Sequence, residues 1–569
     1  MTLDWWVDVL RSEIRGTATL HLDRPANGAL DLDTRDLTIE AVTDNSGAPI
    51  LFELADPDPI LGQRLRLSTV SDVVHIRYRT SPNASALQWL TPAQTTGGRH
   101  PFVFTQCQAI HARSVVPCQD TPRVRIQFSA TVDVPKPLTA VMAAAATGQH
   151  DGDDGRAVFT FEMPQPIPPY LLAFAAGDLA SADIGPRARI YAEPPVIEAA
   201  AWEFADINAH LECAEALFGS YEWDRFDMLV MPASFPYGGM ENPRLTFLTP
   251  TLLAGDRSLV SVVAHELAHS WTGNLVTNAN ANHFWLNEGF TVYAERRIVE
   301  AIYGQPTRVL HDAVERKHLE DDIERLSATN PALTQLRVNL EGYDPDEVYS
   351  SVPYEKGYLF LARLEQAAGR SRFDTFLKRY IEKFRFTSIV TDDLLQLLKG
   401  EFPDLLDGVD IDDWIDGPGL PADAPQTPAS RLNEVIALAH DWARGHRPES
   451  AAINTLNADE WRAFLAALPS VMPLEEIEWF EQTYRLSTMQ NAEIKVGWLA
   501  IAARSGAEAL YDAVETTLLE FGRMKYLRPL YEGLIEAGPQ GKVRASAIFE
   551  KAKSKYHPVA RSLAARLVA

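Results

Sequence analysis

The sequence predicts a multidomain α+β protein with three parts: an antiparallel β saddle or sandwich, a mixed α/β domain and an α-helical domain. Three observations predict this class. Apolar residues alternate with polar ones in the first third, helical spacing enters in the middle, and helical spacing alone follows a proline-rich stretch. At 569 residues the chain is also too long for a single hydrophobic core.

The β-rich domain is predicted to span residues 1–178. Its strongest signals are short runs of strict alternation, the pattern of half-buried strands, separated by clusters of Pro and Gly. We interpret the domain as an antiparallel sandwich or saddle. The runs are 17–22, 74–78, 124–128 and 158–161.

The mixed domain is predicted to span residues 179–416. Residues 199–218 have the spacing of a helix, and the apolar run 226–231 predicts a strand. Residues 417–430 contain four prolines, which predicts an extended linker. Residues 431–569 read as consecutive helices with short polar breaks, a pattern that resembles an α-solenoid of the HEAT or armadillo type.

Composition excludes several classes of protein. The net charge of −25 argues against nucleic-acid and anionic-membrane partners. No run approaches the roughly 18 apolar residues of a membrane span, and the amino terminus carries acids where a signal peptide needs bases. Three cysteines fit a reducing compartment. We therefore expect a cytoplasmic protein, and a monomer.

A five-residue motif, His265-Glu266-Leu267-Ala268-His269, predicts a metal centre. Positions four apart lie one helical turn above each other, so both imidazoles can bind one ion while Glu266 lies beside it. Zinc of the catalytic kind needs three protein ligands and an open position for water, for which the Glu can act as general base. The alternative is a pair of core histidines on an amphipathic helix.

The third ligand is predicted to come from a second helix. Glu288 follows His269 by 19 residues, which leaves room for a loop and a return. Glu295 lies seven residues further, on nearly the same helical face, where it could orient a ligand imidazole. The alternative for Glu295 is a solvated glutamate on a helix surface.

A glycine-rich stretch, Tyr237-Gly238-Gly239-Met240-Glu241, precedes the motif. Two glycines let a backbone approach a ligand closely. A carboxylate near a metal cleft could bind the free α-ammonium of a peptide, which would make the site an exopeptidase site. The alternative is a bulged edge strand with a surface glutamate.

Together these stretches resemble the M1 family of zinc aminopeptidases, and within it the leukotriene A4 hydrolase subfamily and its bacterial relatives. The likeness covers residues from about 85 to 530. The motifs that carry it are Gly238–Asn242, His265–His269 with Glu288, Tyr349–Gly357, Gln106–His111, Pro117–Pro122 and Gly522–Lys525.

The resemblance implies a thermolysin-like catalytic domain that binds one Zn²⁺ per chain through His265, His269 and Glu288. It implies that Glu266 is the general base and that Tyr354 donates a hydrogen bond to the oxyanion. It also implies that Asn287 and Glu295 support the ligands. Substrate contacts are implied for Gln106, Gln108, Tyr237, Gly238, Gly239, Met240, Glu241, Tyr349, Arg523 and Lys525.

The predicted function is removal of N-terminal residues from short peptides. Two alternatives stay open: a non-catalytic scaffold of the same fold that binds peptides or partners, and an additional epoxide hydrolase activity. Asp346 stands where the lipid-hydrolysing branch carries the carboxylate linked to epoxide opening. Ala281, however, stands where that branch has a large aromatic residue, which argues against lipid chemistry.

Overall fold

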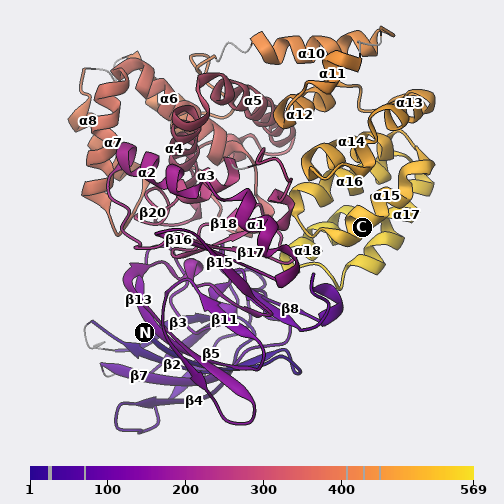
Figure 1. Ribbon diagram of the computed structural model, residues 1–569. Coiled ribbons are helices and arrows are strands. Elements are labelled where there is room, and N and C mark those ends of the chain that lie inside the picture. The colour runs from indigo at the N-terminus through magenta and orange to yellow at the C-terminus, as the bar shows by residue number, and fades with distance from the viewer. Residues whose placement is uncertain (24–27, 69–71, 260, 405–407, 427–429, 447–449) are drawn as a thin grey trace.

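The computed structural model describes residues 1–23, 28–68, 72–259, 261–404, 408–426, 430–446 and 450–569. Sheets form the base of the molecule, helices of the middle region stand above them, and the C-terminal helices lie against one side of both (Figure 1). The predicted order of a β-rich, a mixed and a helical part is confirmed.

The largest sheet has seven strands in the order β12-β13-β10-β1-β2-β7-β4. Alternate residues of β1 are buried, as the period of two requires, and Trp5 and Val7 enter the core. All its pairs are antiparallel except β1 with β10, which are parallel. The strands are β1 (Thr2–Asp8), β2 (Glu13–His21), β4 (Thr38–Asp44), β7 (Val73–Arg79), β10 (Ile126–Pro135), β12 (Ala145–Asp151) and β13 (Arg156–Ile167).

Two smaller sheets complete the β-domain. The four-stranded sheet, β11-β14-β9-β8, contains two strands whose residues are all buried, because it lies between the large sheet and the rest of the molecule. The three-stranded sheet, β3-β6-β5, has its own small core. Their strands are β8 (Leu87–Leu90), β9 (Phe102–Thr105), β11 (Thr139–Met142), β14 (Phe174–Gly177), β3 (Leu30–Thr34), β5 (Phe52–Leu54) and β6 (Gln63–Leu67).

Over the described residues, the middle region combines a mixed five-stranded sheet with nine helices. In the order β15-β16-β17-β19-β18 the three central strands run parallel and both edge strands antiparallel. The elements are β15 (Ala180–Gly185), β16 (Ala188–Ala192), β17 (Asp227–Val230), β18 (Gly239–Met240), β19 (Leu245–Leu248), β20 (Val276–Asn278), β21 (Thr387–Ile389), α1 (Ile197–Glu203), α2 (Ile207–Phe218), α3 (Ser261–Ala268), α4 (Trp285–Tyr303), α5 (Gln305–Ser327), α6 (Gly357–Ala368), α7 (Arg370–Phe384), α8 (Thr391–Glu401) and α9 (Ile411–Asp416).

The helix expected over 199–218 is two helices, α1 and α2. The break falls at Phe204, whose N–H bonds to the carbonyl of Ala200 and ends α1. Phe204 and Ile207 are both buried, so the apolar residues continue through the break. The spacing of apolar residues alone therefore could not reveal it.

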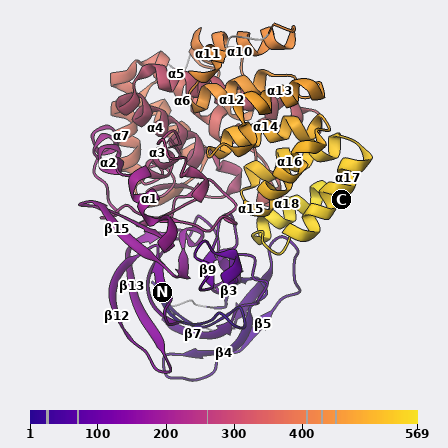
Figure 2. The same ribbon diagram turned by 45° about the vertical axis from the view of Figure 1, so that its right-hand side comes forward.

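The C-terminal helices stack in pairs beside the middle region (Figure 2). They have two cores of their own, and Leu310 and Val314 of α5 belong to the first of them. Helix α5 thereby joins the two regions. The helices are α10 (Ser430–Ala443), α11 (Ser450–Asn454), α12 (Ala458–Ala467), α13 (Leu474–Tyr484), α14 (Ala492–Arg504), α15 (Tyr511–Glu520), α16 (Met524–Glu536), α17 (Pro539–Ala552) and α18 (Pro558–Val568).

The predicted proline-rich linker is described as far as residue 426, and Pro428 lies outside the described residues. The described part packs against the middle region. The Gly417 carbonyl accepts a hydrogen bond from Lys356, the Pro425 carbonyl accepts one from Arg316, and Ala424 is buried. This part of the linker is therefore held in place.

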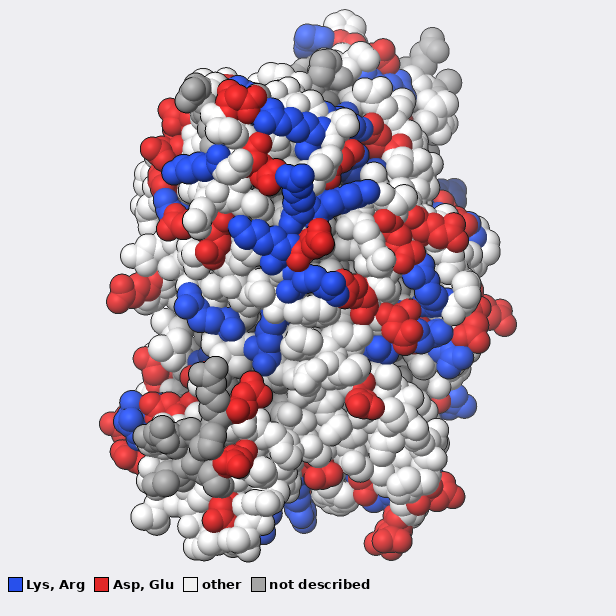
Figure 3. Space-filling view, turned by 90° about the vertical axis from the view of Figure 1, so that its left-hand side faces the viewer, with Lys and Arg blue, Asp and Glu red and all other residues white. Residues whose placement is uncertain are grey.

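No helix in the described part of the chain is long and apolar enough to cross a membrane. The acidic excess of the sequence is not gathered into one patch on the face of Figure 3, where basic and acidic side chains are interspersed.

Candidate active site

The two histidines of the motif converge where α3 ends. His265 lies on the last turn of α3, and the backbone N–H of His269 bonds to the His265 carbonyl just beyond it. Their Nε2 atoms are 3.1 Å apart, and the two rings are nearly perpendicular at 84°. Two imidazole nitrogens so close are the arrangement expected of two ligands that share one cation.

Glu288, in the first turn of α4, completes a triangle. Its Oε2 atom lies 3.4 Å from His265 Nε2 and 3.5 Å from His269 Nε2. Ligand atoms at about 2.0–2.1 Å from a tetrahedral ion are about 3.3 Å apart, so the three separations fit such an ion. Within the described residues this buried oxygen also finds no hydrogen-bond partner, which a cation would supply.

Three carboxylates, those of Glu241, Glu266 and Glu288, lie close to the two histidines. Burial, followed by the nearby Glu288 charge, raises the pKa of Glu241 to about 8. Burial also raises the pKa of Glu266 well above its usual value. A divalent cation among them would favour their ionised forms, because it balances the like charges. Glu241, Glu266 and His269 form a second, overlapping group that could hold a metal.

Each ligand histidine is oriented through its other ring nitrogen. His265 Nδ1 lies 3.0 Å from Glu295 Oε2, the contact predicted from the sequence, and His269 Nδ1 lies 3.1 Å from the Thr272 carbonyl. The predicted Asn287 is fully buried beside the same edge of His269. The carbonyl of Thr272 has no sequence signal, because every residue has one.

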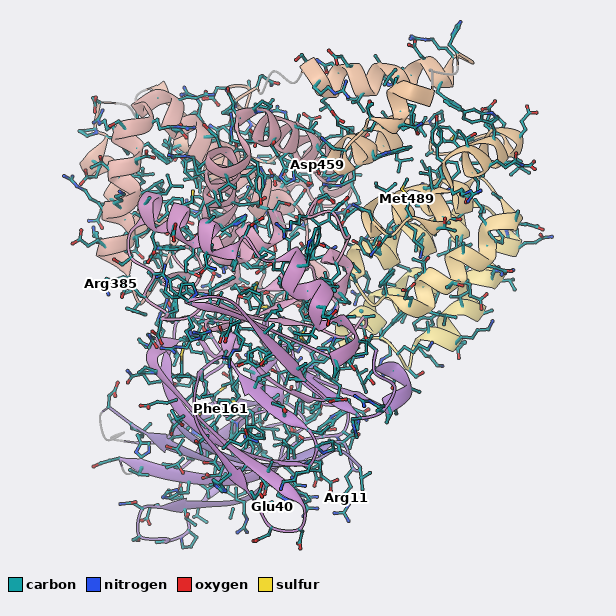
Figure 4. The ribbon with its side chains drawn as sticks, in the orientation of Figure 1. Arg11, Glu40, Phe161, Arg385, Asp459 and Met489 are labelled. Atoms are coloured by element: carbon teal, nitrogen blue, oxygen red, sulfur yellow. The ribbon has the colours of Figure 1, made fainter. Side chains whose placement is uncertain are left out.

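Glu295 is the start of a buried charged network. Although burial opposes its charge, the Arg296 guanidinium, 2.5 Å away, holds the pKa of Glu295 well below its usual range. His311 lies between two carboxylates: its Nδ1 atom is 3.7 Å from Glu295 Oε1, and its Nε2 atom is 3.3 Å from Asp459 Oδ2. Asp459 lies where the C-terminal helices meet the middle region (Figure 4). The network therefore connects the two regions, and the sequence pattern did not reveal it.

Tyr354 lies in a short π-helical turn, Val352–Lys356, that leads into α6. Its ring stacks on His265 at 6.2 Å between centroids and 22° between planes. Burial raises the pKa of Tyr354 well above its usual value, so the phenol keeps its proton and can donate a hydrogen bond. Tyr349 packs edge-on against Tyr354 at 5.7 Å and lines the same cavity.

The two glycines of the glycine-rich stretch are required by close neighbours. A Cβ atom at Gly239 would lie 2.3 Å from Glu266 Oε1, and one at Gly238 would lie 2.7 Å from Arg523 Nη2. Any larger residue would therefore displace Glu266 or Arg523. The short edge strand β18 thus brings both charged groups against its backbone.

Glu241 and Gln108 line the cavity on the side of β18, together with Tyr237. Glu241 is buried, and among the described residues its Oε1 atom has no hydrogen-bond partner. The other two predicted contacts differ: Gln106 and Met240 are buried, and the amide Nε2 of Gln106 lies 3.1 Å from the Met240 sulfur. These two side chains contact each other and are not part of the cavity wall.

Arg523 and Lys525 reach the cavity from the C-terminal helices, at the start of α16. Both contact Glu493: Arg523 Nη1 lies 3.2 Å from Oε1, and Lys525 Nζ lies 2.9 Å from Oε2. Although burial opposes charge on Glu493, the two basic groups hold its pKa well below the usual range. Sequence reasoning missed Glu493, which is about 30 residues from its partners.

One cavity of about 360 Å³ is lined by the predicted site residues, except that Gln106, Met240 and Asn287 are not part of its wall. Its wall takes Gln108 from the β-domain, the histidine motif from the middle region and Arg523 from the C-terminal helices. Ala281 and Asp346 also line it, and Asp346 Oδ2 lies 2.6 Å from His111 Nε2. The cavity can therefore place a metal, a base, a phenol, an acid and two cations around one small ligand.

Three family descriptions match the chain in order. Peptidase M1 N-terminal domain matches residues 4–171, Peptidase family M1 domain matches 202–414, and Leukotriene A4 hydrolase, C-terminal, matches 456–568.

Individual proteins match over nearly the whole chain. Leukotriene A-4 hydrolase of Xenopus laevis is 40% identical over 95% of this chain and 91% of its own length. Leucine aminopeptidase 2 of Yarrowia lipolytica is 38% identical over 100% and 90%. The solved structure of yeast LTA4 hydrolase in complex with Bestatin has a TM-score of 0.91 at 35% identity, covering 100% of this chain and 95% of that one.

Proposed function

The chain belongs to peptidase family M1 and carries the C-terminal domain of the leukotriene A4 hydrolases, and on this premise we propose that it is a zinc aminopeptidase acting on short peptides. The family resemblance predicted from the motifs is confirmed. One observation carries the proposal most strongly: the ligand atoms of His265, His269 and Glu288 form a triangle with sides of 3.1 to 3.5 Å.

The ligand set fits one zinc ion per chain. Two imidazoles and one carboxylate leave a fourth position free, which is the arrangement of catalytic rather than structural sites. When bound, zinc would lower the pKa of a water molecule and polarise the substrate carbonyl. The chain's own residues supply the remaining functions.

The substrate is held at its two ends. Glu241 and Gln108 bind the α-ammonium group, so that the first peptide bond comes to lie beside Glu266. Arg523 and Lys525 bind the C-terminal carboxylate, which favours short peptides because a long one would place its carboxylate elsewhere. Tyr237, Gly238, Gly239 and Tyr349 line the path between them. The contacts assigned to Gln106 and Met240 would be indirect, because neither side chain lines the cavity.

Glu266 is the general base in this proposal. Its carboxylate accepts a proton from the attacking water, which becomes the nucleophile. The phenol O–H of Tyr354 donates a hydrogen bond to the oxygen that develops negative charge. A preorganised donor of this kind lowers the barrier by about 3 kcal/mol. Glu295 and Asn287 keep the two imidazoles in place.

The proposal is tested with a panel of aminoacyl fluorogenic substrates, a chelator and a metal analysis. We expect about one zinc per chain, turnover of several substrates, loss of turnover with chelator and recovery on adding Zn²⁺. If zinc-loaded protein turns over no member of a broad panel, the alternative of a non-catalytic peptide-binding scaffold replaces the enzyme.

An additional epoxide hydrolase activity is the second candidate. It is favoured by the similarity to leukotriene A-4 hydrolase and by Asp346, which lines the cavity and is held by His111 at 2.6 Å. Ala281, which lines the cavity, argues against it, because the resemblance implies a large aromatic residue at this position in the lipid-hydrolysing branch. Incubation with the lipid epoxide, followed by analysis for a diol, decides whether the protein has this additional activity.

Cytoplasmic location and a monomeric state are also part of the proposal. Three free cysteines, Cys107, Cys118 and Cys213, support a reducing compartment. Size-exclusion chromatography with light scattering tests the monomer, and cell fractionation tests the location.

A further inference from the structure

A second cavity of about 310 Å³ adjoins the active-site cavity. It lies between α5, α12, α14 and α16, and it shares Arg462, Glu493 and Lys525 with the first cavity. The boundary between the two cavities is therefore formed by charged groups next to the site proposed for the C-terminal carboxylate of the substrate. We call this second cavity the α14 groove and define it by Leu465, Val496, Gly497, Ala500, Ile501 and Lys525.

The α14 groove is hollow because its helix wall carries small residues. Gly497 and Ala500 lie one turn apart on α14 and occupy little volume, and the position where Gly497 lacks a side chain faces Leu465 of α12. Leu465, Val496 and Ile501 supply apolar walls. An apolar side chain of three or four carbons would bury most of its surface in such a groove.

The charges at the groove entrance do not suit a basic ligand. Both oxygens of Glu493 already accept hydrogen bonds or ion pairs, from Tyr526 and Arg523 on one side and from Lys525 on the other. Arg462 and Arg504 also line the wall, and their carboxylate partners are already engaged: Glu315, Asp459 and Glu493 with Arg462, and Glu536 with Arg504. A basic side chain would meet cations whose counter-ions are engaged, whereas an apolar one would meet Val496 and Ile501.

We propose that the α14 groove binds the side chain of the third residue of a tripeptide substrate and that it selects a large apolar side chain there. The inference deepens the proposed function and rests on it. If Arg523 and Lys525 hold the C-terminal carboxylate of a tripeptide, the side chain of its third residue branches from the Cα atom next to that carboxylate. Lys525 lines both cavities, so that side chain lies at the opening of the groove.

The first test measures kcat/KM for Ala-Ala-Ala, Ala-Ala-Leu and Ala-Ala-Lys on zinc-loaded enzyme. We expect kcat/KM for Ala-Ala-Leu to exceed that for Ala-Ala-Ala by about tenfold, because the side chain of Leu has about three more carbons than that of Ala and the groove buries them in part. We expect kcat/KM for Ala-Ala-Lys to fall below that for Ala-Ala-Ala. Alanine p-nitroanilide, which has no third residue, serves as the reference. Equal values for the three tripeptides would overturn the proposal.

The second test fills the groove with the Gly497→Leu variant. A Cβ at this position would lie 3.3 Å from Leu465 Cδ1, the flexible end of a side chain, and glycine is unfavourable inside a helix, so the variant should fold. We expect the Leu preference to shrink to within about twofold while anilide turnover stays unchanged. Gly400→Leu, on the exposed end of α8, is the matched control. An undiminished Leu preference in Gly497→Leu would overturn the proposal.

A binding measurement separates this inference from the proposed function. Isothermal titration calorimetry of the zinc-loaded Glu266→Gln variant compares the Kd of Ala-Ala-Leu with that of Ala-Ala-Ala, independently of turnover. Tighter binding of Ala-Ala-Leu, lost when Gly497→Leu is added, supports the groove even if no substrate is hydrolysed. Equal Kd values contradict the groove even if the anilide is hydrolysed normally.

Discussion

The two ends of the active-site cavity are built differently. At the histidine end (His265, His269 and Glu288) the side chains come from two neighbouring helices, and one buried oxygen has no hydrogen-bond partner among the described residues. At the clamp end (Arg523, Lys525 and Glu493) the groups come from the start of α16 and from α14, and the two basic side chains share one carboxylate.

This difference indicates how each end would work. The histidine end has excess negative charge and needs a cation before it is balanced, so its chemistry depends on an added ion. The clamp end has two basic groups and one carboxylate, so a substrate carboxylate can bind there by sharing Arg523 and Lys525 with Glu493. Loss of a group at the first end should therefore affect the rate of reaction, and loss at the second should affect substrate affinity.

The largest effect is expected from Glu266→Gln at the histidine end. Glu266 is not one of the three ligands, so zinc should stay bound while kcat falls by about 10³-fold or more, because general-base catalysis is lost. Steady-state kinetics with metal analysis of the same sample provides the measurement. Near-normal kcat in a sample with one zinc per chain would refute the assignment of the base.

Tyr354→Phe should reduce kcat by about 10²- to 10³-fold with little change in KM, because the hydrogen bond is made to charge that develops during the reaction. The ring stacking on His265 would be retained. Tyr343→Phe, at an exposed tyrosine, is the control. A change in KM alone would assign Tyr354 to substrate binding instead.

At the clamp end, Arg523→Ala should raise KM for tripeptides by about 10- to 100-fold, the range expected for one charge-assisted hydrogen bond. Amino-acid anilides, which lack the terminal carboxylate, should be affected much less. Arg528→Ala, on the exposed side of the same helix, is the matched control. Equal losses for both substrate types would remove the clamp from the mechanism.

The smallest effect is expected from Glu493→Gln on stability. The folded-state pKa of Glu493 is lowered, so its ionised form stabilises the protein above about pH 4.5, and this contribution is lost as the pH falls below that value. We expect the variant to be about 1 kcal/mol less stable than the parent at pH 7 and to approach it only near about pH 2.5, because the lowered folded-state pKa keeps the carboxylate ionised at pH 4. Urea unfolding at pH 7 and at about pH 2.5 provides the measurement.

The exposed Glu324→Gln is the control for this comparison. A difference between parent and Glu493→Gln that is constant from pH 7 to about pH 2.5 would show that the carboxylate charge is not what stabilises the clamp end.

Local sequence spacing predicted most of the histidine end. His265 and His269 are one helical turn apart, and Glu288 and Glu295 share a face of the next helix, so the periodicity of α-helices alone aligns them. The resemblance to peptidase family M1 extended this to Tyr354, Glu241 and Arg523. The spacing of apolar residues missed the break between α1 and α2, because buried residues continue across it.

The sequence by itself determined the order of the β-rich, mixed and helical parts, the metal-binding residue types and their spacing, because these depend on periodicities of two and 3.6 residues. Only the tertiary structure decided which distant residues meet. Glu493 pairs with Arg523, Asp459 approaches His311, and Gly497 opens a groove beside Lys525. Such contacts depend on how whole helices pack, and no local pattern of residues records that packing.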